Sequence, residues 1–372
     1  MSPENLSESS VEFVVKRDDW QKSEVLRNPL PQEIGSGVVL FRVDRFALTS
    51  NNITYAVIGE ILGYWTFFPV AAPFGKIPAM GYADVIASRH PDVAEGERVF
   101  GFFPMATHLV IEAGEVSGGA LVDMAAHRQA TAPTYRQYLR AKGDALYEAG
   151  REDQIMLLRG LFITSFLVDD YLADNSNFGA RTVVISSASS KTAIALAFLL
   201  SRRGDLRVLG LTSPRNVAFV EGLGCYGEVL TYDQIDGLPG SEPAAFVDLA
   251  GNGEVLAAVH GYFGDNLKYS GGVGATHWGS KRSRAVLPGP KPAFFFAPTQ
   301  IGKRTAEWGA GGLLQRQAEA WREFLLFSDS WLEVVRAAGP EKVESVYREV
   351  LEGRARPEQG HVLSLWPDSA TS

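Results

Sequence analysis

The sequence Val183-Val-Ile-Ser-Ser-Ala-Ser-Ser-Lys-Thr-Ala-Ile-Ala-Leu-Ala-Phe-Leu-Leu200 decides the fold. It runs from an apolar, β-branched segment through a turn of small residues into a pattern with helical periodicity. That order is typical of the strand, turn and helix that open a dinucleotide-binding βαβ unit. The usual glycine spacing, G-x-x-G-x-x-G, falls here on Ser187, Ser190 and Ala193, which are small but are not glycine. The motif therefore needs support from the sequence around it.

Strands and helices alternate from this stretch onward. The pattern predicts a strand at 183–186, a helix at 190–202, a strand at 207–211, a helix near 216–223, strands at 228–230 and 245–249, a helix near 253–262, and strands near 266–270 and 294–297. Such alternation indicates a parallel sheet with right-handed crossovers. An apolar helix at 157–172 leads into the first strand, residues 315–352 are expected to be helical, and 360–372 to fray.

The part of the chain before residue 120 is rich in strand signals. Ser36–Leu48 alternates apolar and polar residues, and Gly81–Ser88, Arg98–Phe103 and His108–Glu112 are further short strands. These spacings predict a small, partly closed β-domain. Residues 120–155, where tyrosines stand among charges, are expected to form an insertion of mostly helix and loop.

A chain of 372 residues suits two domains better than one core. We expect a β-rich catalytic or substrate domain at 1–160, which includes the insertion, and a dinucleotide-binding domain at 161–300. Residues 301–372 are expected to form a helical segment that returns to the catalytic domain. The predicted fold class is α/β.

Composition and charge exclude several classes of protein. The net charge of −8 argues against a nucleic-acid surface, which needs clustered cations. No uninterrupted apolar run is long enough to span a membrane, and the polar, acidic residues 1–10 are no signal peptide. Cys225 is the sole cysteine, so an internal disulfide and a four-cysteine zinc site are both impossible. We expect a cytoplasmic protein.

The whole chain resembles the medium-chain dehydrogenase/reductase superfamily, as an outlying family near its zinc-free quinone oxidoreductase and enoyl reductase branch. The likeness spans about residues 35–335, and beside 183–193 it rests on four segments: Ala47–Tyr55, Gly81–Phe100, Leu223–Tyr232 and Phe246–Gly251. It implies a Rossmann-type parallel-sheet domain plus a GroES-like β-rich domain, and a homodimer that pairs edge strands near 294–297. The lost glycines, the 120–155 insertion and the missing zinc-ligand cysteines depart from the superfamily's pattern.

The turn after residue 186 is the predicted cofactor site. A pyrophosphate at a helix N-terminus is held by backbone N–H groups and by the helix dipole. Ser189 or Ser190 can cap the helix that begins near Lys191, and Lys191 puts a cation where the dipole alone would disfavour it. A bound anion would remove that conflict, so we assign Ser187, Ser189, Ser190, Lys191 and Thr192 to cofactor binding. The alternative is a surface lysine on an ordinary capped helix.

The residues after the second strand indicate which dinucleotide binds. An NAD site usually has an acidic residue there for the ribose diol, but Leu209-Gly-Leu-Thr-Ser-Pro-Arg-Asn216 has none. Thr212 and Ser213 offer hydroxyls, and Arg215 offers a guanidinium that suits a 2′-phosphate. We therefore predict NADP(H), although the same residues also fit a capped helix start with a solvated arginine. The resemblance adds Tyr232, near the adenosine phosphate, and Gly251.

The predicted reaction site lies in the β-rich half. Asn52, Thr54 and Tyr55 follow a strand where the related enzymes line the nicotinamide pocket, and Tyr64 loosely resembles their proton-donating tyrosine. We predict that Tyr55 or Tyr64 donates a proton, because a phenol stays protonated at neutral pH. The neighbouring Trp65, Phe67 and Phe68 are expected either to line an apolar pocket or to pack in the core.

No metal site is predicted, since the six histidines lack metal-ligand spacing. His277, in the glycine-rich run 271–278, is a weaker candidate to touch cofactor or substrate. Two functions remain open. One is an NADP(H)-dependent, metal-independent oxidoreductase that transfers hydride to an activated double bond or carbonyl of an apolar small molecule. The other is a dinucleotide-binding protein without turnover, such as a redox sensor or scaffold, which the lost glycines favour.

Overall fold

The computed structural model describes residues 9–273 and 287–367. The chain divides into two compact units. The Rossmann unit is Leu158–Leu332, and the β-rich unit combines Met1–Leu157 with Glu333–Ser372. No helix in the described part of the chain is both long and apolar enough to cross a membrane.

The Rossmann unit is built on a six-stranded sheet in the order β12-β11-β10-β13-β14-β15, with every neighbouring pair parallel. Its strands are β10 (Thr182–Ile185), β11 (Arg207–Thr212), β12 (Glu228–Thr231), β13 (Ala244–Asp248), β14 (Leu267–Val273) and β15 (Ala293–Phe295). The predicted parallel sheet is therefore confirmed. The first strand in sequence, β10, is central and wholly buried, which explains its unbroken apolar run.

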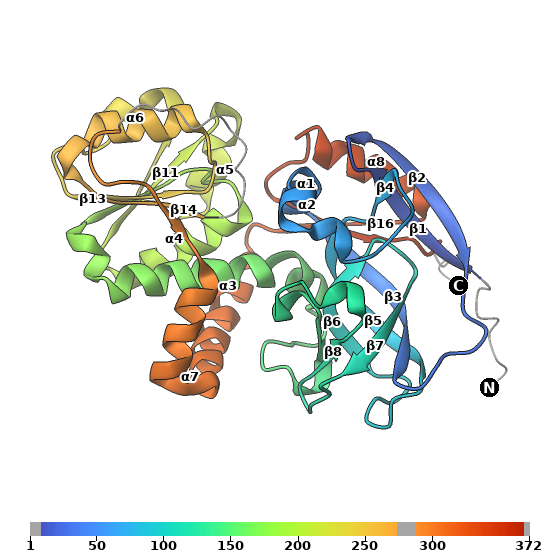
Figure 1. The fold of residues 1–372 in the computed structure, drawn as a ribbon. Helices are drawn as coiled ribbons and strands as arrows, with labels where there is room; N and C mark the ends of the chain where they lie inside the picture. Colours follow the sequence, from blue (N-terminus) through green and yellow to red (C-terminus); the bar gives the residue numbers. More distant parts are fainter. Residues whose placement is uncertain (1–8, 274–286, 368–372) are drawn as a thin grey trace. The chain divides into compact units, whose positions relative to one another are not determined.

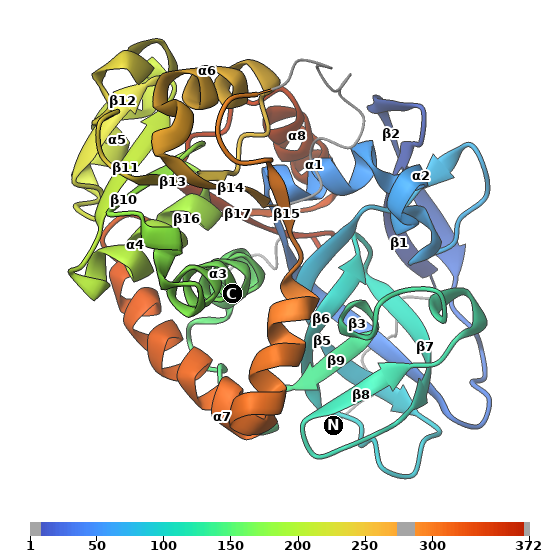
Figure 2. The same ribbon diagram turned by 60° about the vertical axis from the view of Figure 1, so that its left-hand side comes forward.

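Helices cover both faces of this sheet (Figure 1), with α3 and α4 on one side and α6 on the other. The helices of the unit are α3 (Glu152–Asp174, which begins in the β-rich unit), α4 (Lys191–Arg203), α5 (Val217–Gly222), α6 (Gly253–Phe263) and α7 (Ala297–Ser328). Short 3-10 turns lie at Ser176–Gly179, Pro214–Asn216, Tyr232–Gly237 and Gly264–Asn266. Figure 2 shows α7 as two arms, because Gly309 breaks its helical backbone with a φ of 73°.

The β-rich unit contains a closed ring of antiparallel strands. Six strands follow one another as β3-β5-β6-β9-β8-β7, and an additional β3–β7 pairing closes the ring. Their bounds are β3 (Val38–Leu48), β5 (Pro78–Ser88), β6 (Arg98–Pro104), β7 (His108–Gly114), β8 (Ala120–Asp123) and β9 (Gln137–Arg140). The barrel-like domain that the strand spacing predicts is present, and its ring closes completely.

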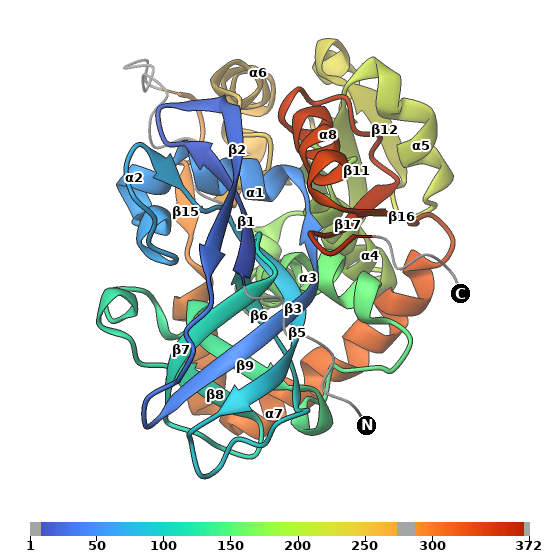
Figure 3. The same ribbon diagram turned by 90° about the vertical axis from the view of Figure 1, so that its right-hand side faces the viewer.

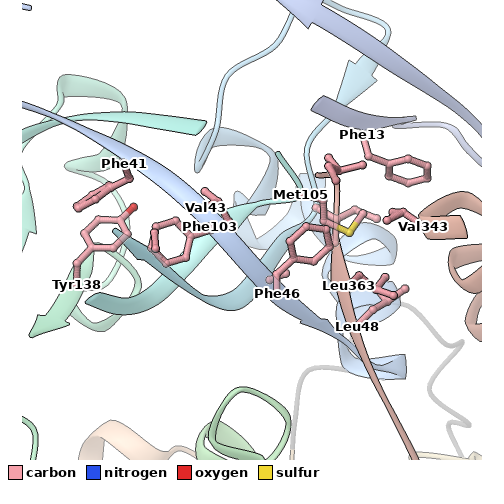
Figure 4. Packing of buried hydrophobic residues seen from close by; sticks show 14 of the residues in the cluster. Phe13, Phe41, Val43, Phe46, Leu48, Phe103, Met105, Tyr138, Val343 and Leu363 are labelled. Carbon is pink, nitrogen blue, oxygen red and sulfur yellow. The ribbon is translucent and has the colours of Figure 1, made fainter. Parts of the chain in front are cut away.

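Further strands and helices extend this ring. The others in the unit are β1 (Ser9–Lys16), β2 (Asp19–Pro29), β4 (Phe74–Gly75), β16 (Glu333–Ala338), β17 (Gln359–Ser364), α1 (Ser50–Val57), α2 (Gly59–Leu62) and α8 (Pro340–Leu351), with 3-10 turns at Tyr64–Thr66, Ala126–Arg128, Pro133–Tyr135 and Ala141–Gly143. Figure 3 shows the long β1–β2 hairpin beside the ring. Figure 4 shows the core, where Phe41, Phe103 and Tyr138 pack inside the ring, and Phe13 and Val343 join from β1 and α8.

Two predictions about local structure are wrong, and a third is incomplete. Residues 120–155 are mostly loop and short helical turns, as predicted, but they also contain β8 and β9, which complete the ring. The expected helix at 315–352 is interrupted by β16, and the expected frayed end at 360–372 contains β17, which pairs with β3. In each case pairing with a distant strand overrides the local pattern. The hairpin of β1 and β2 was not predicted.

Candidate functional site

The turn between β10 and α4 has the backbone that a glycine usually supplies. Ser187 stands at the first glycine position with a φ of 53°, in the left-handed region that L-residues rarely adopt. Ser190 is the N-cap of α4, and its hydroxyl accepts from the backbone N–H of Ala193 at 3.3 Å. The backbone N–H of Ser190 in turn donates to the Ser187 carbonyl at 2.8 Å. The serines therefore reproduce the tight turn into a helix that the motif requires.

Side chains from two further strand ends meet this turn. The Asn216 amide donates to the Ser189 hydroxyl at 2.9 Å, and the Thr212 hydroxyl lies 3.5 Å from the same oxygen. The Tyr232 hydroxyl accepts from the Ser187 backbone N–H at 3.1 Å. Burial raises the pKa of Tyr232, so its phenol keeps its proton. The structure thus brings together three of the predicted residues, Ser189, Thr212 and Tyr232, at one turn.

Gly251 stands in a second turn, after β13, that is tied to β10. The Ser186 hydroxyl donates to Asp248 Oδ1 at 2.7 Å and accepts from the backbone N–H groups of Leu249 and Ala250. Asp248 Oδ1 also accepts from the Gly251 N–H at 2.9 Å, where the glycine has a φ of 59°. Ser186 and Asp248 were not predicted as site residues. Their signal was present, because Ser186 lies between a buried strand and Ser187, and Asp248 ends a buried strand three residues before Gly251.

The remaining predicted cofactor residues lie around the same strand ends. Lys191 and Thr192 form the first turn of α4 and are partly exposed, and the Thr192 carbonyl accepts from the Ser165 hydroxyl at 2.7 Å. Ser213 is the N-cap of the turn that Pro214 opens, as the sequence predicts, and Arg215 is exposed on that turn. His277 lies outside the described residues.

The predicted reaction residues belong to an aromatic cluster in the β-rich unit. We define the tyrosine cluster as Tyr55 of α1, Tyr64, Phe67, Phe102 of β6 and Tyr135. The rings of Tyr55 and Tyr64 have centroids 4.6 Å apart, and Tyr64 meets Tyr135 edge-on at 5.9 Å. Phe67 and Phe102 each lie within 5.2 Å of the Tyr135 ring. The adjacent segments that carry Tyr55 and Tyr64 and the distant segment that carries Tyr135 therefore place three phenols in one cluster.

Two of these phenols have polar partners and a raised pKa. The Asn51 amide donates to the Tyr55 hydroxyl at 2.7 Å, and the hydroxyls of Tyr64 and Tyr135 lie 3.4 Å apart. Burial around the hydroxyl raises the pKa of Tyr55, and burial together with the nearby Tyr135 raises the pKa of Tyr64. Both phenols stay protonated at neutral pH, so they can donate a proton but only to a strongly basic atom.

Asn52 and Thr54 have hydrogen bonds within the fold. The Asn52 carbonyl oxygen accepts from the backbone N–H of Thr49 at 2.7 Å, in the capping box that starts α1. Its amide donates to the Pro78 carbonyl at 2.9 Å, and the residue is buried. The Thr54 hydroxyl points back to the Ser50 carbonyl at 3.4 Å. A direct role for either residue in a reaction stays a prediction.

The neighbouring aromatic residues divide between core and cluster. Trp65 is buried in the core, where a Cβ added at Gly59 or Gly75 would come within 2.4 Å of its ring. Phe67 instead joins the tyrosine cluster. The guanidinium of Arg128, with no exposed surface, lies 5.0 Å from the Phe67 ring centroid and 4.8 Å from that of Phe68.

Sequence reasoning missed Asn51 and Arg128 as residues of this site, and it noted Tyr135 as one of the tyrosines among charges in 120–155. Asn51 could have been found, because it lies four residues before Tyr55 in a helix and so on the same face. Arg128 and Tyr135 gave no such signal, since their contacts with Phe67 depend on how β8 and β9 close the ring. Within residues 9–273 and 287–367 no group of three acidic, histidine or cysteine side chains is placed to hold a metal ion.

Comparisons with known proteins agree with this architecture. A family model described as "Protein of unknown function (DUF2855)" matches residues 46–356. No curated protein matches the sequence. Among solved structures, CurA of Vibrio vulnificus in complex with NADPH is 14% identical with a TM-score of 0.63, over 95% of this chain and 98% of that one.

Two other solved structures show the same architecture. A mutant enoyl thioester reductase of Candida tropicalis is 11% identical with a TM-score of 0.56, over 96% and 99% of the two chains. The human synaptic vesicle membrane protein VAT-1 homolog-like protein is 13% identical with a TM-score of 0.54, over 96% and 98%. At these identities the likeness shows the fold alone, and it confirms the predicted combination of a Rossmann-type domain with a β-rich domain.

Proposed function

The chain belongs to the DUF2855 family, and from its two sites we propose that it is an NADP(H)-dependent oxidoreductase. The Rossmann unit would bind the dinucleotide, and the tyrosine cluster of the β-rich unit would supply the proton. The substrate would be an apolar small molecule with an activated double bond or carbonyl. Bound NADPH would supply a hydride, so the protein has only to hold the reactants and deliver a proton.

The observation that carries the proposal is the left-handed Ser187. A non-glycine residue holds this conformation at a cost, and such strain concentrates at functional sites. The turn also ends in a capped helix N-terminus, which favours a phosphate group. The residues therefore fit a dinucleotide: Ser187, Ser189, Ser190, Lys191 and Thr192 would hold the pyrophosphate, with Tyr232 and Gly251 beside it.

The preference for NADP(H) over NAD(H) depends on the end of β11. Thr212 is buried against the turn, Ser213 caps the next one, and Arg215 is exposed, where its charge suits a 2′-phosphate. The complex of CurA with NADPH supports the same choice.

The test is Arg215→Ala, with binding of NADPH and NADH measured by calorimetry. We expect NADPH binding to weaken by about 1–3 kcal/mol, as for a lost charged hydrogen bond, and NADH binding to stay unchanged. Arg181→Ala is the matched control, because that exposed arginine precedes the opposite end of β10. An equal loss for both dinucleotides, or tighter NADH binding in the natural protein, would contradict the assignment.

Tyr55 and Tyr64 are the two candidate proton donors. The Tyr55 oxygen accepts from Asn51, which leaves its own proton available, and the residue is half-buried. Tyr64 is only 7% exposed, and its hydroxyl faces that of Tyr135. Either phenol would protonate the carbanion or oxyanion that hydride addition leaves on the substrate.

The second candidate function is dinucleotide binding without turnover. Its specific support is that the Ser187 N–H, a group that phosphates bind in glycine-rich turns, already donates to Tyr232. Thermal stabilisation by NADPH, followed by a screen of enones, quinones and aldehydes for NADPH oxidation, separates the two functions. Stabilisation with no oxidation of any compound would favour the binding protein.

The proposal also covers the cellular compartment and the oligomeric state of the protein. We infer a cytoplasmic protein, because the single cysteine, Cys225, is buried and free, which suits a reducing compartment. We also propose a homodimer that pairs edge strands near β15, where Phe294 is 45% exposed and Phe296 58%. Light scattering at micromolar concentration tests the dimer, and a monomer mass would contradict it.

A further inference from the structure

A buried proton donor needs a route by which its proton is replaced. Tyr64 is buried, but Tyr135 is a half-buried residue, and its hydroxyl lies 3.4 Å from the Tyr64 hydroxyl. We propose that Tyr135 is a proton relay that returns a proton from solvent to Tyr64 after each turnover. This inference rests on the proposed function, and it names Tyr64 as the donor that the relay serves.

Packing fixes the Tyr135 ring in the position that the relay needs. Phe67 and Phe102 lie against it at 5.1 and 5.2 Å between centroids, and the Tyr64 ring meets it at 87°. Such edge-on contacts between aromatic rings are favourable. The separation of 3.4 Å is long for a hydrogen bond between hydroxyls. Catalytic hydrogen bonds are often long in unliganded enzymes and tighten when substrate binds.

Arg128 is the residue that positions Tyr135. Its guanidinium donates to the backbone carbonyls of both Tyr135 and Phe67 (2.9 Å to the latter), and its Nε lies 3.5 Å from a carboxylate oxygen of Asp123. A buried charge of this kind is costly in stability. It joins the segment after β8 to the segment after Tyr64, so it keeps the two phenols facing each other. The buried guanidinium of Arg128 is therefore the positioning group of the relay.

The proton transfers balance as follows. The O–H bond of Tyr64 breaks as its proton passes to the basic atom of the substrate, which leaves a Tyr64 phenolate. Tyr135 then gives its hydroxyl proton to that phenolate, and the Tyr135 phenolate takes a proton from a hydronium ion or a buffer acid. No electrons move in these steps, and both phenols end in their starting state.

Two other interpretations of the same geometry are possible. Tyr135 could contribute only the packing of its ring to the cluster, in which case its hydroxyl is not needed for turnover. Alternatively Tyr55, whose oxygen accepts from Asn51, could donate without the Tyr64–Tyr135 pair. Both interpretations predict that removing the Tyr135 hydroxyl leaves turnover unchanged, whereas the relay predicts a specific kinetic defect.

The kinetic experiment compares Tyr135→Phe with Tyr138→Phe in the full-length protein. Tyr138 is the matched control, because its buried hydroxyl has no hydrogen-bond partner among the described residues and lies in the barrel core. Reprotonation follows the chemical step, so Tyr135→Phe should lower kcat by about tenfold or more and change kcat/KM by less than about twofold. A weak acid such as imidazolium should restore kcat. Adding Tyr135→Phe to Tyr64→Phe should cause no further loss.

A second measurement does not depend on turnover. In protein labelled with carbon-13 at the tyrosine Cζ atoms, Tyr135→Phe should shift the Tyr64 Cζ resonance at neutral pH, because the two hydroxyls lie 3.4 Å apart. Tyr138→Phe should leave that resonance in place. If the protein oxidises NADPH and Tyr135→Phe leaves kcat intact, or its effect adds fully to that of Tyr64→Phe, the relay is wrong and the proposed function stands. If nothing is turned over, the function fails, and an unmoved Tyr64 resonance then overturns the contact between the two hydroxyls.

Discussion

The phosphate turn of the Rossmann unit and the tyrosine cluster of the β-rich unit are assembled in opposite ways. In the turn, residues 186–191 are consecutive, and the strand before them and the helix after them fix their geometry. In the cluster, Tyr55, Tyr64 and Tyr135 come from segments up to 80 residues apart, since 135 − 55 = 80. The backbone geometry of the turn follows from consecutive residues, whereas the cluster forms only in the tertiary structure.

This difference predicts how each region responds to substitution. A change at Ser187 or Ser190 alters one or two backbone hydrogen bonds, because these two serines act on residues next to them in the turn. A change in the cluster reaches several segments, because Arg128 alone contacts groups on Phe67, Tyr135 and Asp123. We therefore expect large effects in the cluster and small ones in the turn.

The largest effect is expected from the proton donors. Tyr64→Phe keeps the ring and removes the hydroxyl, so it should slow NADPH oxidation by about 10²–10⁴-fold and leave NADPH affinity unchanged. Tyr55→Phe, measured alongside, decides which phenol donates. If neither variant slows turnover by even roughly tenfold, the donor lies elsewhere. If both lose folding stability instead, these tyrosines belong to the core.

A large loss of stability is expected from Arg128→Met. The variant leaves the buried Asp123 carboxylate without its cation and two carbonyls without their donor. Removing one partner of a buried pair typically costs about 3–5 kcal/mol, which urea denaturation would measure. Arg136→Met is the control, since Arg136 lies in the same segment and donates to the exposed Gln129 side chain. Equal losses in the two variants would show that the segment, and not the buried charge, matters.

Substitutions in the turn should have small effects of opposite sign. Ser187→Gly relieves a left-handed serine but adds flexibility to the unfolded chain, so it should change stability by less than about 1 kcal/mol, towards stabilisation. Ser190→Ala removes the helix cap and should cost about 1 kcal/mol. Thermal unfolding of both variants checks this contrast. A clear destabilisation by Ser187→Gly would mean that its side chain, rather than its backbone, is what the turn uses.

The smallest effect is expected from metal removal. We predict that EDTA leaves NADPH oxidation unchanged, because a phenol and a dinucleotide suffice for the proposed reaction. Assays before and after dialysis against the chelator measure this. Loss of turnover that zinc restores would refute metal independence.

Local sequence determined the Rossmann unit almost element by element. The buried strand 182–185, the capped helix from Lys191 and the turn opened by Pro214 lie where the pattern predicts them, because each depends on residues adjacent in the chain. The candidate residues Ser189, Thr212 and Tyr232 could be predicted for the same reason, since parallel strands bring their carboxyl ends to one edge of the sheet.

Only the tertiary structure decided how the β-rich unit is completed, because the local pattern already predicts β3, β5, β6 and β7. Residues 120–123, 137–140, 333–338 and 359–364 have weak local strand patterns, and they became β8, β9, β16 and β17 because the ring and its extension offer them unpaired strands. The closure of the ring also determined the contacts of Arg128 and Tyr135, which no periodic pattern in the sequence predicts. The partner of a strand is determined by hydrogen bonds and burial between residues far apart in the chain. The sequence by itself therefore identified the phenols but did not predict the cluster that they form.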